Sequence, residues 1–226
     1  MVLRVGSNIG DPALAGNPNL RFVPYALHGL WGLARKMVAG DTSTALADLN
    51  RGMFVLELEV VGRMYRDSVP LLAGSDEPNP YTIPGFSLHD ELGLLVAAGL
   101  SPMAALQAAT RSPALMLGAL DSLGTIETGK VADLVLLAAN PLDDIANTRR
   151  IDAVVIGGTL LDRPALDRML ASASGSSWRL GVAALILGGA IAHRVPTAVL
   201  LGLAAIPVLI LVGLIIWRRR SRSRRR

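Results

Sequence analysis

Cysteine is absent from the 226 residues of the chain, and histidine is scarce. Without cysteine there can be no disulfide, no thiolate nucleophile and no cysteine-ligated zinc. The three histidines, His28, His89 and His193, are not paired at the spacing of a metal-binding His-x-His or His-Glu-x-x-His motif. Gly-x-Ser-x-Gly motifs and phosphate-binding glycine loops are missing as well. The histidines therefore cannot build a two-metal centre by themselves, and His28 and His193 are interpreted as structural.

Lysine is nearly absent too, because Lys36 and Lys130 are the two lysines of the chain and its other basic residues are arginines. The net charge is +4, but seven of the 22 basic residues lie in the basic tail, residues 218–226. The rest of the chain holds 15 basic and 18 acidic residues, and is slightly acidic. No basic stripe with interleaved aromatic residues occurs outside the tail, so nucleic-acid binding is not expected.

Apolar residues are abundant and unevenly distributed. They make up 51% of the chain, and the mean hydropathy of +0.45 is high for a protein without lipid contacts. Residues 199–217 carry no charge and would span roughly 28 Å as a helix, enough to cross a bilayer core. Residues 180–192 form a shorter apolar run, either a second span or an interfacial segment. We therefore expect one or two transmembrane helices within residues 178–217, in contact with membrane lipid.

The two ends of the chain bear on its orientation in the membrane. The basic tail is expected on the cytoplasmic side by the positive-inside rule. The N-terminus shows no signal-peptide pattern, which disfavours a single span that would leave the body outside. The favoured prediction is a helical hairpin, with the body and the tail both cytoplasmic.

Helical signals fill the middle of the body. Three short helices are predicted at residues 87–98, from the Ser101-Pro102 capping pair onward, and at residues 112–118. Residues 1–40 are rich in Gly, Pro and Asn and are predicted as loop with at most one short strand. A long helix is predicted over residues 41–66, where apolar residues recur three or four positions apart and form one stripe: Leu46, Leu49, Met53, Leu56, Val60 and Met64.

Strand signals lie on both sides of the short helices. Residues 69–74 are a short apolar run that suits a parallel strand buried on both faces. After residue 120, β-branched residues and glycine turns predict a small sheet with strands at residues 124–129, 132–137 and 151–156. Residues 171–177 are small and polar and are predicted as a linker. The sequence thus predicts an α/β protein with a change of layer near residue 120.

Two residues are candidates for chemistry. Asp76 directly follows the predicted strand 69–74, and ligand-binding loops converge at the carboxyl ends of parallel strands. Its carboxylate can bind a divalent metal, act as a general base on water, or merely fix its own loop. His89 is a candidate substrate-binding residue at a helix start, beside Asp90 and Glu91. Acidic residues in a first helical turn are also ordinary partners of the helix dipole, so a structural interpretation stays open.

Six motifs follow one another along the body. Four precede residue 120: VPLLAGSDEP (69–78), IPGFSLHDEL (83–92), AAGLSP (97–102) and AALQAAT (104–110). Two follow it: LGTIETGKVADLVLL (123–137) and NPLDDIANT (140–148). In this order and at these spacings they resemble the amidohydrolase superfamily, in particular its imidazolonepropionase-like and Xaa-Pro dipeptidase-like members. The resemblance covers roughly residues 1–170.

The resemblance implies the C-terminal part of a (β/α)8 barrel followed by strands of a small β-sandwich, and a hydrolase of C–N bonds other than ordinary peptide bonds. It also implies one or two divalent metal ions, zinc being the first expectation. In the family, the Asp that matches Asp76 binds metal and takes a proton from the attacking water. The family's first-strand histidine pair, its bridging Lys or Glu and its later histidines have no counterpart in this sequence. Hydrolysis would then need ligands from another polypeptide.

The expected organisation is a barrel portion in residues 1–120 and a β-sandwich portion in residues 121–170, followed by the linker, the spans and the tail. Two functions remain open. In the first, an N-terminal half supplied by another chain completes a hydrolytic site around Asp76. In the second, the chain is a non-catalytic, membrane-anchored remnant or interaction protein.

Overall fold

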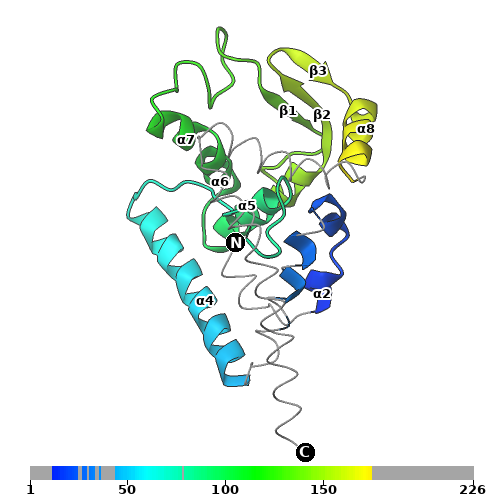
Figure 1. The fold of residues 1–226 in the computed structure, drawn as a ribbon. Coiled ribbons are helices and arrows are strands. Elements are labelled where there is room, and N and C mark those ends of the chain that lie inside the picture. The colour runs from blue at the N-terminus through cyan, green and yellow to red at the C-terminus, as the bar shows by residue number, and fades with distance from the viewer. Residues whose placement is uncertain are drawn as a thin grey trace, which may run out of the picture. The chain divides into compact units, whose positions relative to one another are not determined.

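The structure is a computed structural model that describes residues 12–24, 27–29, 31–33, 36, 44–77 and 79–174 (Figure 1). All of them belong to the first of two units into which the chain divides, residues 1–175. The predicted spans within residues 178–217 and the basic tail lie outside the described residues. Within the described ranges, no helix combines the length and the apolar character needed to cross a bilayer.

Helix α4 (Thr44–Arg66) confirms the long helix predicted in this part of the sequence. It packs on the rest of the body through Leu58 and Val61. A Cβ atom at Gly62 would lie 2.2 Å from the carbonyl oxygen of Ala98, so the close approach of the two segments requires glycine here. Four members of the predicted apolar stripe are exposed instead: Leu49 by 59%, Met53 by 46%, Leu56 by 58% and Val60 by 46%.

The three short helices are also confirmed, as α5 (Ser87–Ala97), α6 (Pro102–Ala109) and α7 (Arg111–Met116). Local signals set their limits: the Ser101 hydroxyl accepts a hydrogen bond from the Ala104 amide at 3.2 Å, and Pro102 occupies the first turn of α6. Helices α5 and α6 contribute to the larger of two buried apolar clusters, which consists of Leu92, Leu95, Ala98, Leu100, Ala105, Ala108 and Ile145.

The prediction of a strand at residues 69–74 is wrong. The segment is irregular, and Val69 and Leu72 are each 40% exposed. Its amide contacts include a bond from Ala73 N to Ala108 O at 2.9 Å, at the end of α6. A parallel strand exists only where neighbouring strands pair with its backbone groups, and the described residues place no strand beside this segment. An apolar run indicates that a strand can form, but it does not supply the partner.

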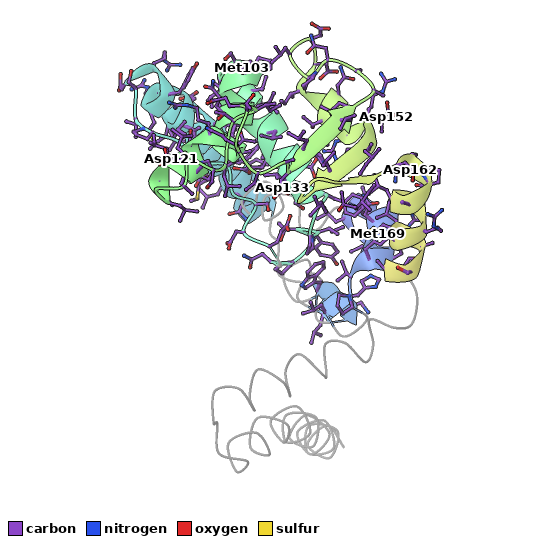
Figure 2. The ribbon with its side chains drawn as sticks, turned by 90° about the horizontal axis from the view of Figure 1, so that it is seen from above. Met103, Asp121, Asp133, Asp152, Asp162 and Met169 are labelled. Atoms are coloured by element: carbon purple, nitrogen blue, oxygen red, sulfur yellow. The ribbon has the colours of Figure 1, made fainter. Side chains whose placement is uncertain are left out.

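The small sheet is confirmed and is antiparallel. Strands β1 (Leu134–Leu137), β2 (Ile151–Ile156) and β3 (Thr159–Leu161) lie in the order β1-β2-β3. Strand β2 matches its prediction, whereas β3 was not predicted. The carboxylate of Asp133 accepts a hydrogen bond from the Gly157 amide at 2.6 Å, which ties the start of β1 to the turn between β2 and β3 (Figure 2).

No strand forms at residues 124–129, contrary to the prediction, because this segment is a series of bends and turns. The ammonium group of Lys130 organises it by donating to the Leu120 carbonyl at 2.6 Å and to the Thr125 hydroxyl. Gly124 has φ +86°, and a Cβ atom there would lie 2.6 Å from that of Ala114. Ile126 is 85% exposed. The glycines and β-branched residues thus belong to a loop held by a nearly buried lysine.

Two further helices complete the second half of the body. The 3-10 helix η2 (Ile145–Arg149) connects β1 to β2, and its Ile145 enters the larger cluster. Helix α8 (Arg163–Ala173) begins after Asp162, whose carboxylate accepts a hydrogen bond from the Ala165 amide at 2.9 Å (Figure 2). Helix α8 was not predicted from the sequence, and it extends over the first residues of the predicted linker 171–177.

The N-terminal segment contains more structure than the loop that was predicted. Helix α2 (Pro12–Ala15) and the 3-10 helix η1 (Pro18–Phe22) are short, but the segment builds a second apolar cluster with residues after the Asp76 loop. Phe22 stacks on Phe86 with ring centroids 5.2 Å apart. The buried members of this cluster are Leu20, Val23, Trp31, Tyr81 and Ile83.

Candidate functional site

Asp76 lies in an exposed turn that follows the irregular segment 69–74. Its φ of 56° is in the left-handed region, which a non-glycine residue adopts at a cost of about 1 kcal/mol. The side-chain amide of Asn79 compensates by donating to the Asp76 carboxylate at 2.7 Å and to the Asp76 carbonyl at 3.0 Å. The Thr82 hydroxyl in turn donates to the Asn79 carbonyl at 2.6 Å. Asp76 therefore does fix its own loop, as one of the predicted alternatives stated.

This loop role uses one of the two carboxylate oxygens of Asp76. Oδ2 accepts the bond from Asn79, while Oδ1 has no hydrogen-bond partner in the part of the chain that the structure describes. A carboxylate with one fixed and one free oxygen is oriented, and it still has lone pairs for a water molecule or a cation. Fixing the loop and accepting a proton are thus compatible roles for the same side chain.

Glu77, the neighbour of Asp76, was missed by sequence reasoning. Its Oε1 atom is buried and lacks a hydrogen-bond partner among the described residues. A buried oxygen without a donor costs about 1–3 kcal/mol, and a charged one costs more. No motif points to this residue, and the signal is visible only in three dimensions.

His89 is held by a residue 59 positions away in the sequence. Its Nδ1 atom lies 3.0 Å from the hydroxyl of Thr148, which donates to the Ile145 carbonyl at 2.8 Å. Thr148 is buried and His89 is half-buried. Burial lowers the pKa of His89 below its usual value of 6.5, the Arg149 cation lowers it further, and Asp90 opposes the shift. The imidazole is therefore kept neutral near pH 7.

A second contact runs beside the first. The guanidinium group of Arg149 lies 2.6 Å from a carboxylate oxygen of Asp90, so consecutive residues of α5 meet consecutive residues of η2. Asp90 is thereby part of a bridge between the helical half and the sheet half of the body. Thr148 and Arg149 were not identified as site residues, although Thr148 ends the motif at residues 140–148. Only the fold shows that they meet α5.

The predicted site residues do not come together as a metal centre. Asp76 and His89 share no hydrogen bond, and the described residues contain no group of three or more His, Asp or Glu side chains that could hold an ion. A protein metal site of this kind needs about three protein ligands. The described residues therefore do not fit a metal by themselves, and the assignment of Asp76 as a ligand stays a prediction.

Comparison with known proteins agrees with the motifs. Residues 51–161 match the Amidohydrolase family. The chain is similar to an imidazolonepropionase from Aeromonas salmonicida (strain A449), with 32% identity over 143 residues that cover 61% of this chain and 34% of that protein. Among solved structures, a bottromycin amidohydrolase matches with a TM-score of 0.58 and 26% identity, over 76% of this chain and 38% of that one.

A crystal structure of a Xaa-Pro dipeptidase with bound methionine matches at 30% identity and a TM-score of 0.43, over 46% of this chain and 25% of that one. The chain spans about a third of the length of the imidazolonepropionase to which it is similar. The amidohydrolase family is generally metal-dependent. The resemblance predicted from the motifs is supported in part, because residues 51–161 match the Amidohydrolase family and the chain is similar to amidohydrolases of known structure.

Proposed function

We propose that this chain is the C-terminal part of an amidohydrolase that hydrolyses a C–N bond other than an ordinary peptide bond. The observation that carries the proposal is Asp76, which follows the motif segment 69–74 within the family match and is oriented by Asn79. Asp76 is exposed, and its Oδ1 atom has no hydrogen-bond partner among the described residues, which leaves it available to a reactant. The names of the relatives support hydrolysis of a C–N bond as the reaction class.

Within this proposal Asp76 is the proton acceptor. A carboxylate can take a proton from a water molecule placed within hydrogen-bond distance. Asn79 fixes the carboxylate through Oδ2, so Oδ1 meets the water in one orientation. Because the turn is exposed, a second surface must cover it to exclude bulk solvent from the reaction.

The remaining ligands come from another polypeptide in this proposal. The described residues lack a three-ligand group, and the buried Oε1 of Glu77 lacks a donor among them. Both observations fit a site that is completed when a complementary part of the fold docks against the Asp76 loop. Zinc is the metal we expect in the completed site, because histidine and carboxylate ligands suit it.

A second candidate function is a non-catalytic interaction protein. It is favoured by the bond from Asn79 to Asp76, which gives the carboxylate a structural role, and by the exposed apolar stripe of α4. In this alternative the family fold persists as a binding surface, and Asp76 is retained only for its turn.

Attachment to a membrane belongs to both proposals and rests on the sequence alone. Residues 178–217 supply the apolar runs and residues 218–226 the basic tail, which together suit a cytoplasmic body anchored by a hairpin. Washing membranes with alkaline carbonate tests this attachment. We expect the full chain to stay with the lipid, and release by the wash would contradict the anchor.

Co-expression tests the hydrolase proposal. The full chain is produced together with an amidohydrolase segment that carries the His-x-His pair, and the purified complex is analysed for bound zinc and for hydrolysis of Xaa-Pro dipeptides and N-acyl amides. We expect about stoichiometric zinc, and an Asp76→Asn variant that loses at least about a hundredfold in kcat, as expected for a lost general base. Asp152→Asn, a change at an exposed carboxylate in β2, is the matched control.

Two results separate the candidate functions. The hydrolase proposal would be contradicted if no metal-bound complex formed and if the Asp152→Asn control were as inactive in hydrolysis as Asp76→Asn. The interaction-protein alternative fails if the isolated chain binds zinc stoichiometrically and loses it in Asp76→Ala.

A further inference from the structure

Buried hydroxyl groups gather in the segment that joins Asp76 to helix α5. Among the described residues, the buried polar side chains are Thr82, Ser87 and Thr148, and the first two lie in this segment. Thr82 is 0% exposed and Ser87 is 2% exposed, whereas Asp76 itself is exposed. Burying a hydroxyl group costs free energy unless it forms a hydrogen bond, so these two side chains mark contacts on which the shape of the segment depends.

Each of the two hydroxyl groups bonds to the backbone of its own segment. The Thr82 hydroxyl donates to the Asn79 carbonyl at 2.6 Å, and the Thr82 amide donates to the same oxygen at 2.9 Å. The Ser87 hydroxyl accepts a hydrogen bond from the Ile83 amide at 2.7 Å. Ile83 is 2% exposed and belongs to the second apolar cluster, which fixes the position of Thr82 beside it. The backbone of Asn79 is thus attached to a buried part of the chain.

Asn79 carries this attachment to Asp76. Its side-chain amide donates to Asp76 Oδ2 at 2.7 Å, and its backbone amide donates to the Asp76 carbonyl at 3.2 Å. Asp76 has a φ of 56°, and a left-handed residue of this kind persists only where its surroundings hold it. The direction of the Asn79 side chain depends on the Asn79 backbone, which Thr82 holds. A series of contacts therefore leads from the buried Thr82 to the exposed carboxylate.

We propose that Thr82 is a positioning residue, which holds the Asp76 carboxylate in one orientation through Asn79. The inference rests on the proposed function, in which Oδ1 of Asp76 takes a proton from water. Proton transfer requires the carboxylate oxygen and the water to meet within a narrow range of distances and angles. Thr82 touches neither the water nor a substrate, because its side chain is fully buried. Its contribution is to the geometry of Asp76, and Ser87 supports it from the start of α5.

The substitution Thr82→Val removes the hydroxyl and nearly keeps the shape of the side chain. The Asn79 carbonyl retains the bond from the backbone amide of residue 82, so no buried acceptor loses its last donor and the variant should fold. Thr82→Ser keeps the hydroxyl and is the conservative variant. Thr110→Val is the matched control, because the Thr110 hydroxyl donates to the Leu106 carbonyl at 2.8 Å, at the end of α6 and outside the Asp76 loop.

Steady-state kinetics of the complex with the co-expressed His-x-His segment measure the effect on hydrolysis. We expect Thr82→Val to lower kcat about tenfold and to change KM by less than about twofold, since a misplaced proton acceptor slows the reaction without altering substrate contacts. Thr82→Ser and Thr110→Val should stay within about twofold of the wild type in kcat. Circular dichroism checks that all three variants keep the helices of the wild type.

Nuclear magnetic resonance of the isotope-labelled full chain in detergent micelles supplies a second measurement that needs no hydrolysis. The rate at which the Asn79 side-chain amide exchanges hydrogen with water reports on its bond to Asp76. We expect Thr82→Val to raise this rate at least about threefold, and Thr82→Ser to leave it unchanged. Asp76→Ala removes the acceptor and gives the rate of the released amide.

The results separate the inference from the function on which it rests. A wild-type complex that hydrolyses no substrate contradicts the proposed function, and the exchange rate in Thr82→Val then decides the inference alone. An unchanged exchange rate in Thr82→Val overturns the inference, and so does an active complex in which Asp76→Asn is inactive while Thr82→Val keeps the wild-type kcat. A kcat loss in Thr110→Val equal to that in Thr82→Val also overturns it, because the loss would then reflect general stability.

Discussion

The region where α5 meets η2 and the region from α4 to Glu77 differ in how fully the described residues bury or pair their side chains. In the first region, Ile145, Thr148 and Arg149 of η2 all contact the α5 side, and the larger cluster is closed. In the second region, an apolar stripe of α4 is exposed. Among the described residues, segment 69–74 has no strand beside it, and a buried oxygen of Glu77 has no hydrogen-bond partner. We therefore expect the first region to contribute most to the stability of the body, and we propose the second as the place where another surface would bind.

The largest loss of stability is expected from a substitution that removes a side chain from the larger buried cluster. Ile145→Ala removes a buried side chain from the larger cluster and should lower the free energy of unfolding by about 2–5 kcal/mol. Leu56→Ala, on the exposed apolar stripe of α4, should change it by no more than about 0.5 kcal/mol. Urea denaturation followed by circular dichroism measures both. Equal losses in the two variants would remove the contrast between the regions.

The contact between the two regions is tested at Gly62. Gly62→Ala brings a methyl group against the Ala98 carbonyl and should cost about 1–3 kcal/mol, even though alanine favours a helix. Gly52, in the same helix, has no atom within 4 Å of the position of a Cβ. Gly52→Ala is therefore the matched control and should stabilise the chain by up to about 1 kcal/mol. A stabilising Gly62→Ala would mean that α4 and α5 do not approach as described.

The dependence of stability on pH should report on His89. Because the folded state lowers its pKa below 6.5, the unfolded chain binds the proton more readily. The contribution of His89 is complete above about pH 6.5 and is lost as the pH falls towards the lowered folded value. The difference in unfolding free energy between the wild type and His89→Gln should thus shrink below pH 6.5. A constant difference from pH 8 to pH 5 would contradict the burial of this imidazole.

The smallest loss of stability is expected at the partly exposed ion pair that joins α5 and η2. The Asp90–Arg149 pair is partly open to solvent, with side-chain exposures of 33% and 42%. Arg149→Ala should therefore cost no more than about 1 kcal/mol, and less in high salt. Arg150→Ala, at the next exposed position, is the control. A loss in Arg149→Ala of several kcal/mol would place this pair in a far drier environment than its exposure indicates.

Local signals predicted the parts of the fold that need no distant partner. The Ser101-Pro102 pair gave the start of α6 because a capping hydroxyl acts on the next three residues, and β2 was predicted at residues 151–156 from its β-branched run. Residues 69–74 failed as a strand because strands need neighbours that the segment itself does not encode. Residues 124–129 failed because Lys130 organises them as a loop.

The candidate site was predictable to a similar extent. Asp76 was predicted from its position after a strand that the structure does not form, and His89 from its position at a helix start. The order of the motifs pointed to the family. Thr148 was not found, because its contact with His89 joins residues 59 positions apart. The bond from Asn79 to Asp76 spans three residues and is the kind of contact that turn chemistry can anticipate.

The Thr148 hydroxyl has a consequence for the tautomer of His89. A hydroxyl group has a single hydrogen, and Thr148 donates it to the carbonyl oxygen of Ile145. The proton between Thr148 and His89 must then come from the ring, so Nδ1 is protonated and Nε2 carries the lone pair. A backbone carbonyl in η2 thus decides which nitrogen of a helix α5 side chain is basic, and the face of the imidazole that remains open can accept a hydrogen bond but cannot donate one.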